Sequence, residues 1–500
     1  RAPVRVNEAG KQTLYLYARL GRLVSPRPWG DSMAVKDSLV YDAAGNLKRT
    51  ITRRGDVITS NYDVRNRDTL TAIPGVGDLR RAVGGPLDQL TRLWFHNFVD
   101  SIGINPALAW VYDQRGRLAS DTAFTDATAR ATSYTYDAYD RPSTTTDALG
   151  VWTLRYESAR GYPDTLLTPF ADTVIYTLDA QDRAVGPTVQ HGGPGQSRVP
   201  AWNSVGALRT ITQSIATPSP YTAGKWDRNL FNEEAPTALG PMWTEQHGAG
   251  AAVDSLQDSV TYDGWQRVTA WVQRKLGTGW VARDTFRFDR LGNIQTTAGG
   301  ETYDATTGRL LSRTDTAGTW SYTYDRAGNL VQAAQGGVTW VYGYDALNRL
   351  RGVWVNGVFV ARYGYDVLGR RIAKRARTKL GAGPIDYTRF VYRGANVAFE
   401  TDSAGTIGLR YVWGPAADDL IAIRDALGNQ VYVVQDRLRS VRGLVRRDGT
   451  WLMSQRFGPY GAVLAQAVDT TGIDFTLRYG WTGREFDVET GFYYHRSRYY

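Results

Sequence analysis

One dipeptide constrains the architecture of this chain more than any other feature. Tyr-Asp occurs ten times in 500 residues, where composition alone would give about two copies. Consecutive copies begin at Tyr303, Tyr324, Tyr344 and Tyr365, so the period is 20 to 21 residues. A single conventional core stops growing near about 250–300 residues. A fixed short period therefore predicts a repeat architecture in which each unit packs on its neighbours.

Each well-formed copy continues from the Tyr-Asp pair into a turn. The Asp carboxylate can accept backbone N–H bonds in that turn, and a following Gly can supply a positive φ. We interpret this motif as structural, and its members are Tyr41, Asp42 and Gly45, Tyr62 and Asp63, Tyr324, Asp325 and Gly328, Tyr344 and Asp345, and Tyr365, Asp366 and Gly369. A calcium ladder built from the same Asp residues is the less favoured interpretation.

The segments between turns have the alternation of half-buried strands. In Trp320–Tyr324, aromatic residues alternate with Ser and Thr, which is a period of two residues. Asn356-Gly357 between β-branched residues is a strong hairpin signal. With two turns in each period, every repeat is predicted to be one β-hairpin. Single hairpins are marginal in water, so they should pair edge to edge into a long antiparallel sheet that twists and curls.

The end of the chain has a more specific pattern. Its residues Gly483, Asp487, Glu489, Thr490, Gly491, Tyr493, Arg496, Arg498, Tyr499 and Tyr500 form a signature that resembles the RHS-associated core. The Tyr-Asp units likewise resemble the YD repeats of bacterial RHS proteins. The resemblance implies an all-β fold in which tandem hairpins form a spiralling antiparallel sheet that closes into a hollow shell. Such a shell encapsulates the C-terminal toxin domain of the same polypeptide in a polymorphic toxin, as in the similar C components of toxin complexes.

The resemblance and the repeat spacing divide the chain into two regions. Residues 1–410 are interpreted as the repeat shell, within which 187–256 is a degenerate part with insertions. Residues 411–500 are interpreted as the RHS-associated core at the end of the shell, without an independent domain boundary. Three tryptophans in the degenerate part, Trp202, Trp226 and Trp243, favour packed structure over a flexible linker.

One residue and one basic segment lead to separate predictions. Arg439 stands where the core signature usually has a glycine, so the local turn is expected to differ. The basic cluster within 370–379 is interpreted as a solvated strand and turn, because no aromatic platform interleaves with its charges. Nucleic acid is therefore not an expected partner of this span.

Candidate chemistry is sparse. The chain has no cysteine, which excludes disulfides and thiol catalysis, and its four histidines have no metal-ligand spacing with one another. A Ser-His-Asp triad stays open because its partners meet only in space. We expect no enzyme in this span, no cofactor and no metal. The resemblance implies aspartyl self-cleavage downstream of Tyr500, with acids that this chain does not contain.

Asp487 and Glu489 could serve as substitute acids for that chemistry. We interpret them instead as structural partners of Arg484, Arg496 or Arg498.

Partners and location follow from the same resemblance. The expected partners are the C-terminal toxin domain and components of a secretion system or toxin complex. The expected location is secreted or at the bacterial cell surface, with the targeting signal outside this span. No uninterrupted apolar stretch approaches the length of about 18 residues that a membrane-spanning helix needs. The alternative left open by the sequence is a cell-surface adhesion or glycan-binding protein, because 16 Trp residues could provide aromatic platforms.

Overall fold

A computed structural model describes most of the chain. The described residues are 4–6, 12–18, 21–27, 36–84, 87–96, 106–124, 129–156, 163–178, 184–191, 196–202, 208–215, 224–232, 242–247, 254–265, 267–275, 279–289, 291–296, 300–414, 418–436, 438–448, 450–469, 475 and 477–500. Side chains from 191 to 259 lie outside the described ones. The packing expected of Trp202, Trp226 and Trp243 therefore falls outside what the structure describes.

The described chain consists almost wholly of β-strands. The strands of the first half are β1 (Val4–Val6), β2 (Gln12–Tyr17), β3 (Leu23–Arg27), β4 (Ser38–Tyr41), β5 (Leu47–Ile51), β6 (Val57–Tyr62), β7 (Asp68–Ile73), β8 (Gly77–Gly84), β9 (Gln89–His96), β10 (Ala107–Tyr112), β11 (Leu118–Phe124), β12 (Ala129–Tyr136), β13 (Pro142–Asp147), β14 (Gly150–Arg155), β15 (Thr165–Leu167), β16 (Asp172–Leu178), β17 (Ala184–His191), β18 (Gln196–Trp202), β19 (Leu208–Ile215), β20 (Gly224–Asn232), β21 (Met242–His247), β22 (Asp254–Tyr262), β23 (Val268–Lys275), β24 (Gly279–Phe288) and β25 (Ile294–Thr296).

The strands of the second half are β26 (Thr302–Tyr303), β27 (Leu310–Asp315), β28 (Gly318–Tyr324), β29 (Leu330–Gln335), β30 (Val338–Tyr344), β31 (Leu350–Val355), β32 (Val358–Tyr365), β33 (Arg371–Lys379), β34 (Ala382–Arg393), β35 (Asn396–Thr401), β36 (Ile407–Trp413), β37 (Leu420–Arg424), β38 (Gln430–Gln435), β39 (Val441–Arg446), β40 (Trp451–Phe457), β41 (Val463–Val468), β42 (Glu485–Asp487) and β43 (Phe492–Tyr494), with one short 3-10 helix, η1 (Trp481–Gly483).

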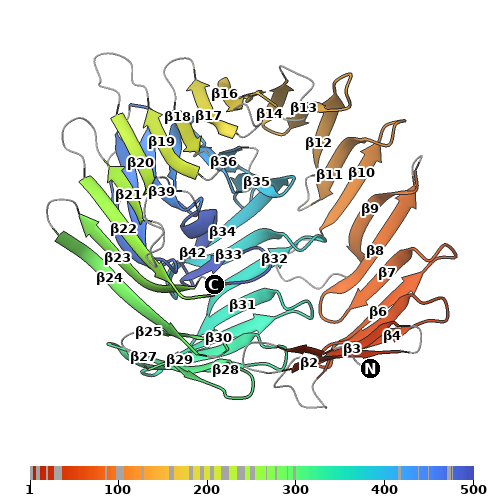
Figure 1. Cartoon of the computed structure of the whole chain (residues 1–500). Helices are drawn as coiled ribbons and strands as arrows, with labels where there is room; N and C mark the ends of the chain where they lie inside the picture. The colour runs from red at the N-terminus through yellow and green to blue at the C-terminus, as the bar shows by residue number, and fades with distance from the viewer. Residues whose placement is uncertain are drawn as a thin grey trace.

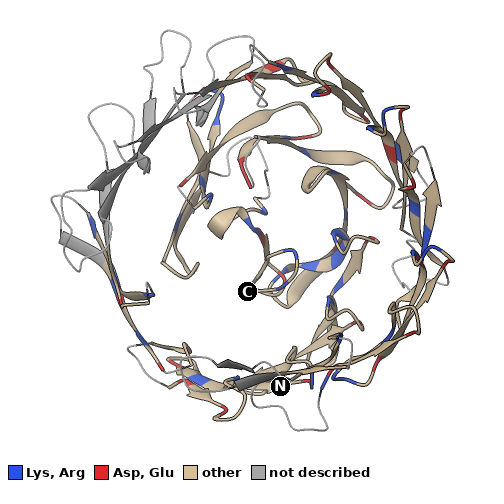
Figure 2. Cartoon of the chain, turned by 45° about the vertical axis from the view of Figure 1, so that its right-hand side comes forward, with Lys and Arg blue, Asp and Glu red and all other residues tan. Residues whose placement is uncertain are grey.

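The strands are joined in sequence order into two large sheets. β4 to β25 form a sheet that returns on itself as a closed ring of strands, and β26 to β41 form a 16-stranded sheet. The second sheet curls inside the ring, and the C-terminus lies near the middle of both views (Figure 1, Figure 2). The predicted all-β fold of long antiparallel sheets is confirmed, with the strands divided between an outer ring and an inner sheet.

The predicted hairpins are present with the expected turn chemistry. Asn356 and Gly357 have φ values of 49° and 77°, and they join β31 to β32 with Val355 opposite Val358. Two successive positive φ values match the right-handed twist of the flanking strands. In β28 the exposed and half-buried residues alternate without exception, as the pattern in Trp320–Tyr324 predicts.

The Asp of the repeat caps its turn as predicted. Asp63 Oδ1 accepts bonds from the backbone N–H groups of Arg65 and Arg67 at 2.8 and 3.0 Å, and its Oδ2 accepts from Arg67 Nε at 2.7 Å. The backbone N–H of Arg67 is the main cause that lowers the pKa of Asp63. Asp42 accepts from the backbone N–H of Asn46 in the same way. The capped turn therefore explains why Asp recurs in the repeat without a bound ion.

The Tyr of the repeat bonds the end of its own strand to the strand before it. Tyr365 Oη donates to the carbonyl of Leu350 at 2.7 Å, and the Arg349 guanidinium lies over the Tyr365 ring at 5.0 Å. Hydroxyl-to-carbonyl bonds of this kind are made by Tyr41, Tyr62, Tyr112, Tyr136, Tyr156, Tyr303 and Tyr392. The packing of an Arg guanidinium on the Tyr ring and the hydrogen bond from the Tyr hydroxyl explain why Tyr recurs once per period.

The inner sheet packs against the ring. One buried cluster joins Trp152 and Val174 of the ring to Ile421 and Tyr432 of the inner sheet. The strand order is unbroken at residue 411, which lies inside β36. Among the described residues, no helix is long and apolar enough to cross a membrane.

Candidate functional site

The final segment, 478–500, leaves the inner sheet and packs back on it. We call this segment the core hairpin, because β42 and β43 pair with Glu485 opposite Tyr494. The N–H groups of Thr490 and Gly491 both donate to the Asp487 carbonyl, at 3.0 and 2.8 Å. Gly491 has a φ of 75°, which glycine adopts without strain. The signature residues Asp487, Thr490 and Gly491 therefore form the turn of this hairpin.

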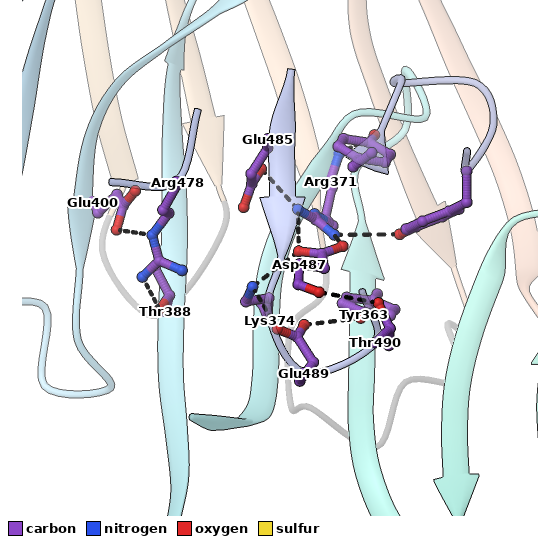
Figure 3. Close-up of polar contacts among 12 residues, drawn as sticks. Tyr363, Arg371, Lys374, Thr388, Glu400, Arg478, Glu485, Asp487, Glu489 and Thr490 are labelled. Atoms are coloured by element: carbon purple, nitrogen blue, oxygen red, sulfur yellow. Dashed lines mark hydrogen bonds and ion pairs between the residues drawn. The ribbon is translucent and has the colours of Figure 1, made fainter. Parts of the chain in front are cut away.

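A buried ion cluster fastens the core hairpin to β33. Arg371 Nη1 and Nη2 lie 2.5 and 3.0 Å from the two carboxylate oxygens of Asp487, and Nη2 also lies 2.7 Å from Glu485 Oε2. Lys374 Nζ lies 2.9 Å from Asp487 Oδ1 and 3.1 Å from Glu489 Oε2. The side chains of Arg371 and Asp487 are fully buried. Figure 3 shows the acids of the hairpin facing the two cations of the strand.

The cluster contains three acids and two bases, and the pKa values of Asp487 and Glu489 shift in opposite directions. Burial favours the neutral form of Asp487, but the charges of Arg371 and Lys374 outweigh it and lower the Asp487 pKa. Burial and then the negative charge of Asp487 raise the pKa of Glu489. Tyr363 Oη donates to Glu489 Oε1 at 2.9 Å. Asp487 is therefore the main counter-ion of the cluster, whereas the surroundings of Glu489 disfavour its ionised form.

Two further contacts hold the ends of the core hairpin. Arg478 Nε lies 2.9 Å from Glu400 Oε2, and its Nη2 donates to Thr388 Oγ1 at 3.0 Å. At the other end, the hydroxyls of Tyr499 and Tyr365 lie 3.1 Å apart. The Glu400 and Arg478 contact is also visible in Figure 3. The hairpin is thus fixed along its length to the inner sheet.

The prediction of which cations bind Asp487 and Glu489 was wrong. Asp487 and Glu489 bind Arg371 and Lys374, whereas Arg484 and Arg496 both bind Asp418. Arg498 does not take the place of either cation in the ion cluster.

The interpretation of the basic cluster as solvated was also wrong for two of its members. Arg371 and Lys374 are buried, because acids more than 110 residues later in the chain neutralise them. A signal for this contact exists in the sequence. Glu485 and Asp487 are two residues apart, so they lie on one face of a strand, and two acids on a buried face would need cations opposite.

The turn at Arg439 does not differ from the other turns. Arg439 has a φ of 65°, its N–H donates to the Asp436 carbonyl at 3.0 Å, and the Asp436 N–H donates to the Ser440 carbonyl at 3.0 Å. Its guanidinium Nη1 lies 2.7 Å from Asp419 Oδ1. The expectation of a different turn was wrong, since Arg439 adopts the left-handed conformation that a glycine would take.

The other signature residues pack around the hairpin. Tyr493 and Tyr500 exchange backbone bonds at 2.9 and 3.0 Å. Trp481 stacks on Tyr500 with ring centroids 5.2 Å apart. A Cβ atom at Gly483 would lie 3.1 Å from the Arg439 carbonyl oxygen, so another residue there would have to displace its neighbours slightly. These contacts give the signature a packing role.

The arrangement pairs fixed charges of opposite sign. Asp487 and Glu489 are both held by Lys374, so neither is positioned as a free acid or base toward a reacting group. In the part of the chain that the structure describes, no three His, Asp or Glu residues gather in a way that could hold a metal ion. What the site does chemically is to clamp the C-terminal segment onto the inner sheet.

Comparison with known proteins places these features in context. Residues 251–500 match the family described as Teneurin YD-shell. "Probable deoxyribonuclease RhsB" of Dickeya dadantii is 29% identical over 205 residues, which cover 38% of this chain and 14% of that protein. The tRNA3(Ser)-specific nuclease WapA of Bacillus spizizenii is 27% identical over 185 residues, which cover 36% of this chain and 7% of that protein.

One solved structure shows a similar fold. The crystal structure of TcdB2-TccC3-TEV aligns with 98% of this chain and 30% of its own chain, at 14% identity and a TM-score of 0.52. The present chain therefore corresponds to a part of each of these longer proteins.

Proposed function

The chain belongs to the teneurin YD-shell family, and from this premise we propose that it is the shell of a bacterial polymorphic toxin. In this proposal the ring and the inner sheet are walls of a closed, hollow container. Its cargo is a toxin domain that follows the core hairpin in the same polypeptide. The similarity to two nucleases and to a TccC3 complex supports this proposal over the adhesion or glycan-binding alternative, which these relatives do not favour.

The position of Tyr500 is the observation that carries the proposal. The C-terminus lies within the ring of strands rather than on its outside (Figure 2). Tyr500 is fixed there, because its ring stacks on Trp481 and its hydroxyl donates to the Tyr460 carbonyl at 3.2 Å. A polypeptide that continued from Tyr500 would start inside the walls. The clamp on the core hairpin would keep that starting point in place.

The proposed mechanism is physical exclusion. Walls that surround the cargo keep it from its target in the producing cell and shield it from proteases. This span needs no catalytic group and no cofactor for that task, and self-cleavage would belong to acids beyond Tyr500. Further proposed partners are components of a secretion system or toxin complex, and the proposed location is secreted or at the cell surface.

A protease-protection assay tests the proposal. The product of the whole uninterrupted reading frame is treated with trypsin in native buffer and after denaturation. We expect the segment after Tyr500 to survive in native buffer and to be digested after denaturation. Equal digestion in both conditions would refute encapsulation. Binding to a glycan array together with that loss of protection would make adhesion the better account.

A further inference from the structure

The inner sheet ends in an exposed apolar strand. β41 is the last strand of the 16-stranded order, and it pairs with β40 on one side, with Phe457 opposite Val463 and Met453 opposite Val468. Val463, Leu464 and Val468 are 48%, 40% and 56% exposed. Among the described residues, no strand pairs with the other edge of β41. That edge presents backbone donors and acceptors to whatever occupies the space beside it.

The strand lacks charge and proline, two of the features that usually protect a free edge, although its pairing with β40 shifts register at Leu464. Natural edge strands are blunted by charged residues, proline, bulges or short length. β41 is six residues of sequence VLAQAV, with no charge and no proline. The opposite end of the same sheet is different, because β26 is only two residues long. β40 supports β41 firmly, since Leu452 and Met453 belong to a buried core cluster. The free edge of β41 therefore lies beside a strand, β40, that is anchored in the buried core.

The end of the chain lies at the turn that precedes this strand. Tyr500 Oη donates to the carbonyl of Tyr460, three residues before β41 in the Gly458–Ala462 turn. A Cβ atom at Gly461 would lie 2.8 Å from the Trp481 ring, so the turn and η1 are in close contact. A polypeptide leaving Tyr500 therefore emerges next to the turn that leads into the free edge.

We propose that the free edge of β41 pairs, strand to strand, with an extended segment of the enclosed cargo. This inference rests on the proposed function, because the occupant is the polypeptide that follows Tyr500. Strand addition uses main-chain hydrogen bonds and apolar side-chain contacts. An edge without charges would accept uncharged, extended segments of many sequences. Such an edge would hold an unfolded cargo without selecting its fold.

The test uses the product of the whole reading frame. A photoreactive phenylalanine analogue is placed at Leu464 and, as a matched control, at Val358. Val358 is 53% exposed and pairs with Val355 of β31, and its strand β32 pairs with β33 from Ala361 onward. We expect irradiation to cross-link position 464 to the backbone of the segment after Tyr500, and hydrogen exchange to show slow amides on the outer edge of β41. We expect the control to give at most a tenth of that cross-link.

Charge variants provide the second arm. The double variant Leu464→Lys and Val468→Lys should speed hydrogen exchange of the outer β41 amides at least tenfold, because charged side chains on an edge strand disfavour strand addition. The cargo should stay protease-resistant in this variant. Val358→Lys should leave that exchange unchanged. If the cargo is protected but the outer amides of β41 exchange as freely as an open edge, the edge pairing is refuted and encapsulation stands. If the cargo is not protected at all, both proposals are overturned.

Discussion

Replacing Asp487 by Asn should release the core hairpin, whereas replacing Glu489 by Gln should not. Asp487 Oδ1 accepts from Arg371 Nη2 and Lys374 Nζ, and its Oδ2 accepts from Arg371 Nη1. An Asn amide has one oxygen, so its NH₂ must face at least one of these cationic donors. Removing one partner of a buried ion pair costs about 3–5 kcal/mol. The lower figure corresponds to about a hundredfold more opening of the hairpin.

Gln at position 489 keeps every contact. Its carbonyl oxygen can accept from Lys374 Nζ, and its NH₂ can donate to the Tyr363 hydroxyl, which then accepts instead of donating. The variant also removes the excess negative charge of the cluster. Because burial and Asp487 raise the pKa of Glu489, losing that charge offsets the weaker hydrogen bonds. We expect a change in the free energy of opening below about 1 kcal/mol.

Hydrogen exchange of the amides in 478–500, followed by mass spectrometry, measures both variants. Exchange reports local opening, which suits a chain of this size better than a two-state unfolding curve. The amides of β42 and β43 should exchange about a hundred times faster in Asp487→Asn than in the parent chain. Those amides in Glu489→Gln should stay within about fivefold of the parent. Equal exchange in the two variants would refute the assignment of Asp487 as the main counter-ion.

Three further predictions concern the repeat and the clamp. Tyr365→Phe removes a buried hydrogen bond to the Leu350 carbonyl and should lower local stability by about 1–2 kcal/mol, as measured by hydrogen exchange of the amides of β31 to β33. Tyr139 is 71% exposed, so Tyr139→Phe should leave local stability unchanged. Equal effects of the two variants would count against the role of the Tyr hydrogen bond. Gly357→Ala has nothing within 4 Å of the added Cβ but a φ of 77°, so it should cost about 1–2 kcal/mol of hairpin stability; no change in the exchange of β31 and β32 would contradict this. Because the pKa of Asp487 is lowered, its ionised form stabilises the clamp at pH values above the ordinary aspartate pKa of about 3.9. Hairpin opening should therefore increase only when the pH falls below that value. If opening stays constant down to about pH 2, Asp487 does not hold the clamp.

The sequence predicted those parts of the fold whose causes are local. The turn after each Tyr-Asp pair depends on bonds between residues two to four positions apart, as between Asp63 and Arg67. The hairpin at Asn356-Gly357 depends on the φ preferences of two adjacent residues. Edge-to-edge pairing of successive hairpins then follows because a lone hairpin is marginal.

The sequence did not predict contacts between distant segments. Arg371 and Asp487 are 116 residues apart, so spacing gives no direct sign of their pairing. Nearby arginines, Arg484 and Arg496, were the simpler choice, yet Asp418 occupies them. The division of the strands into a ring and an inner sheet has the same origin, because packing across layers decides it.

Arg439 shows how a local rule can fail. Glycine is favoured at a positive φ, but an Arg can adopt it at a cost of about 1–2 kcal/mol. The surrounding turn fixes that conformation, and the bond to Asp419 adds to it. The missing glycine therefore changes the energy of the turn without changing its shape.

The most direct test of encapsulation is the intact mass of the product of the whole reading frame, measured first under native and then under denaturing conditions. We predict one native particle that contains both this chain and the segment after Tyr500. If self-cleavage occurs, denaturation should separate that particle into two polypeptides with the break downstream of Tyr500. A reading frame that ends near Tyr500, or a native sample in which the downstream fragment is already separate, would contradict the account.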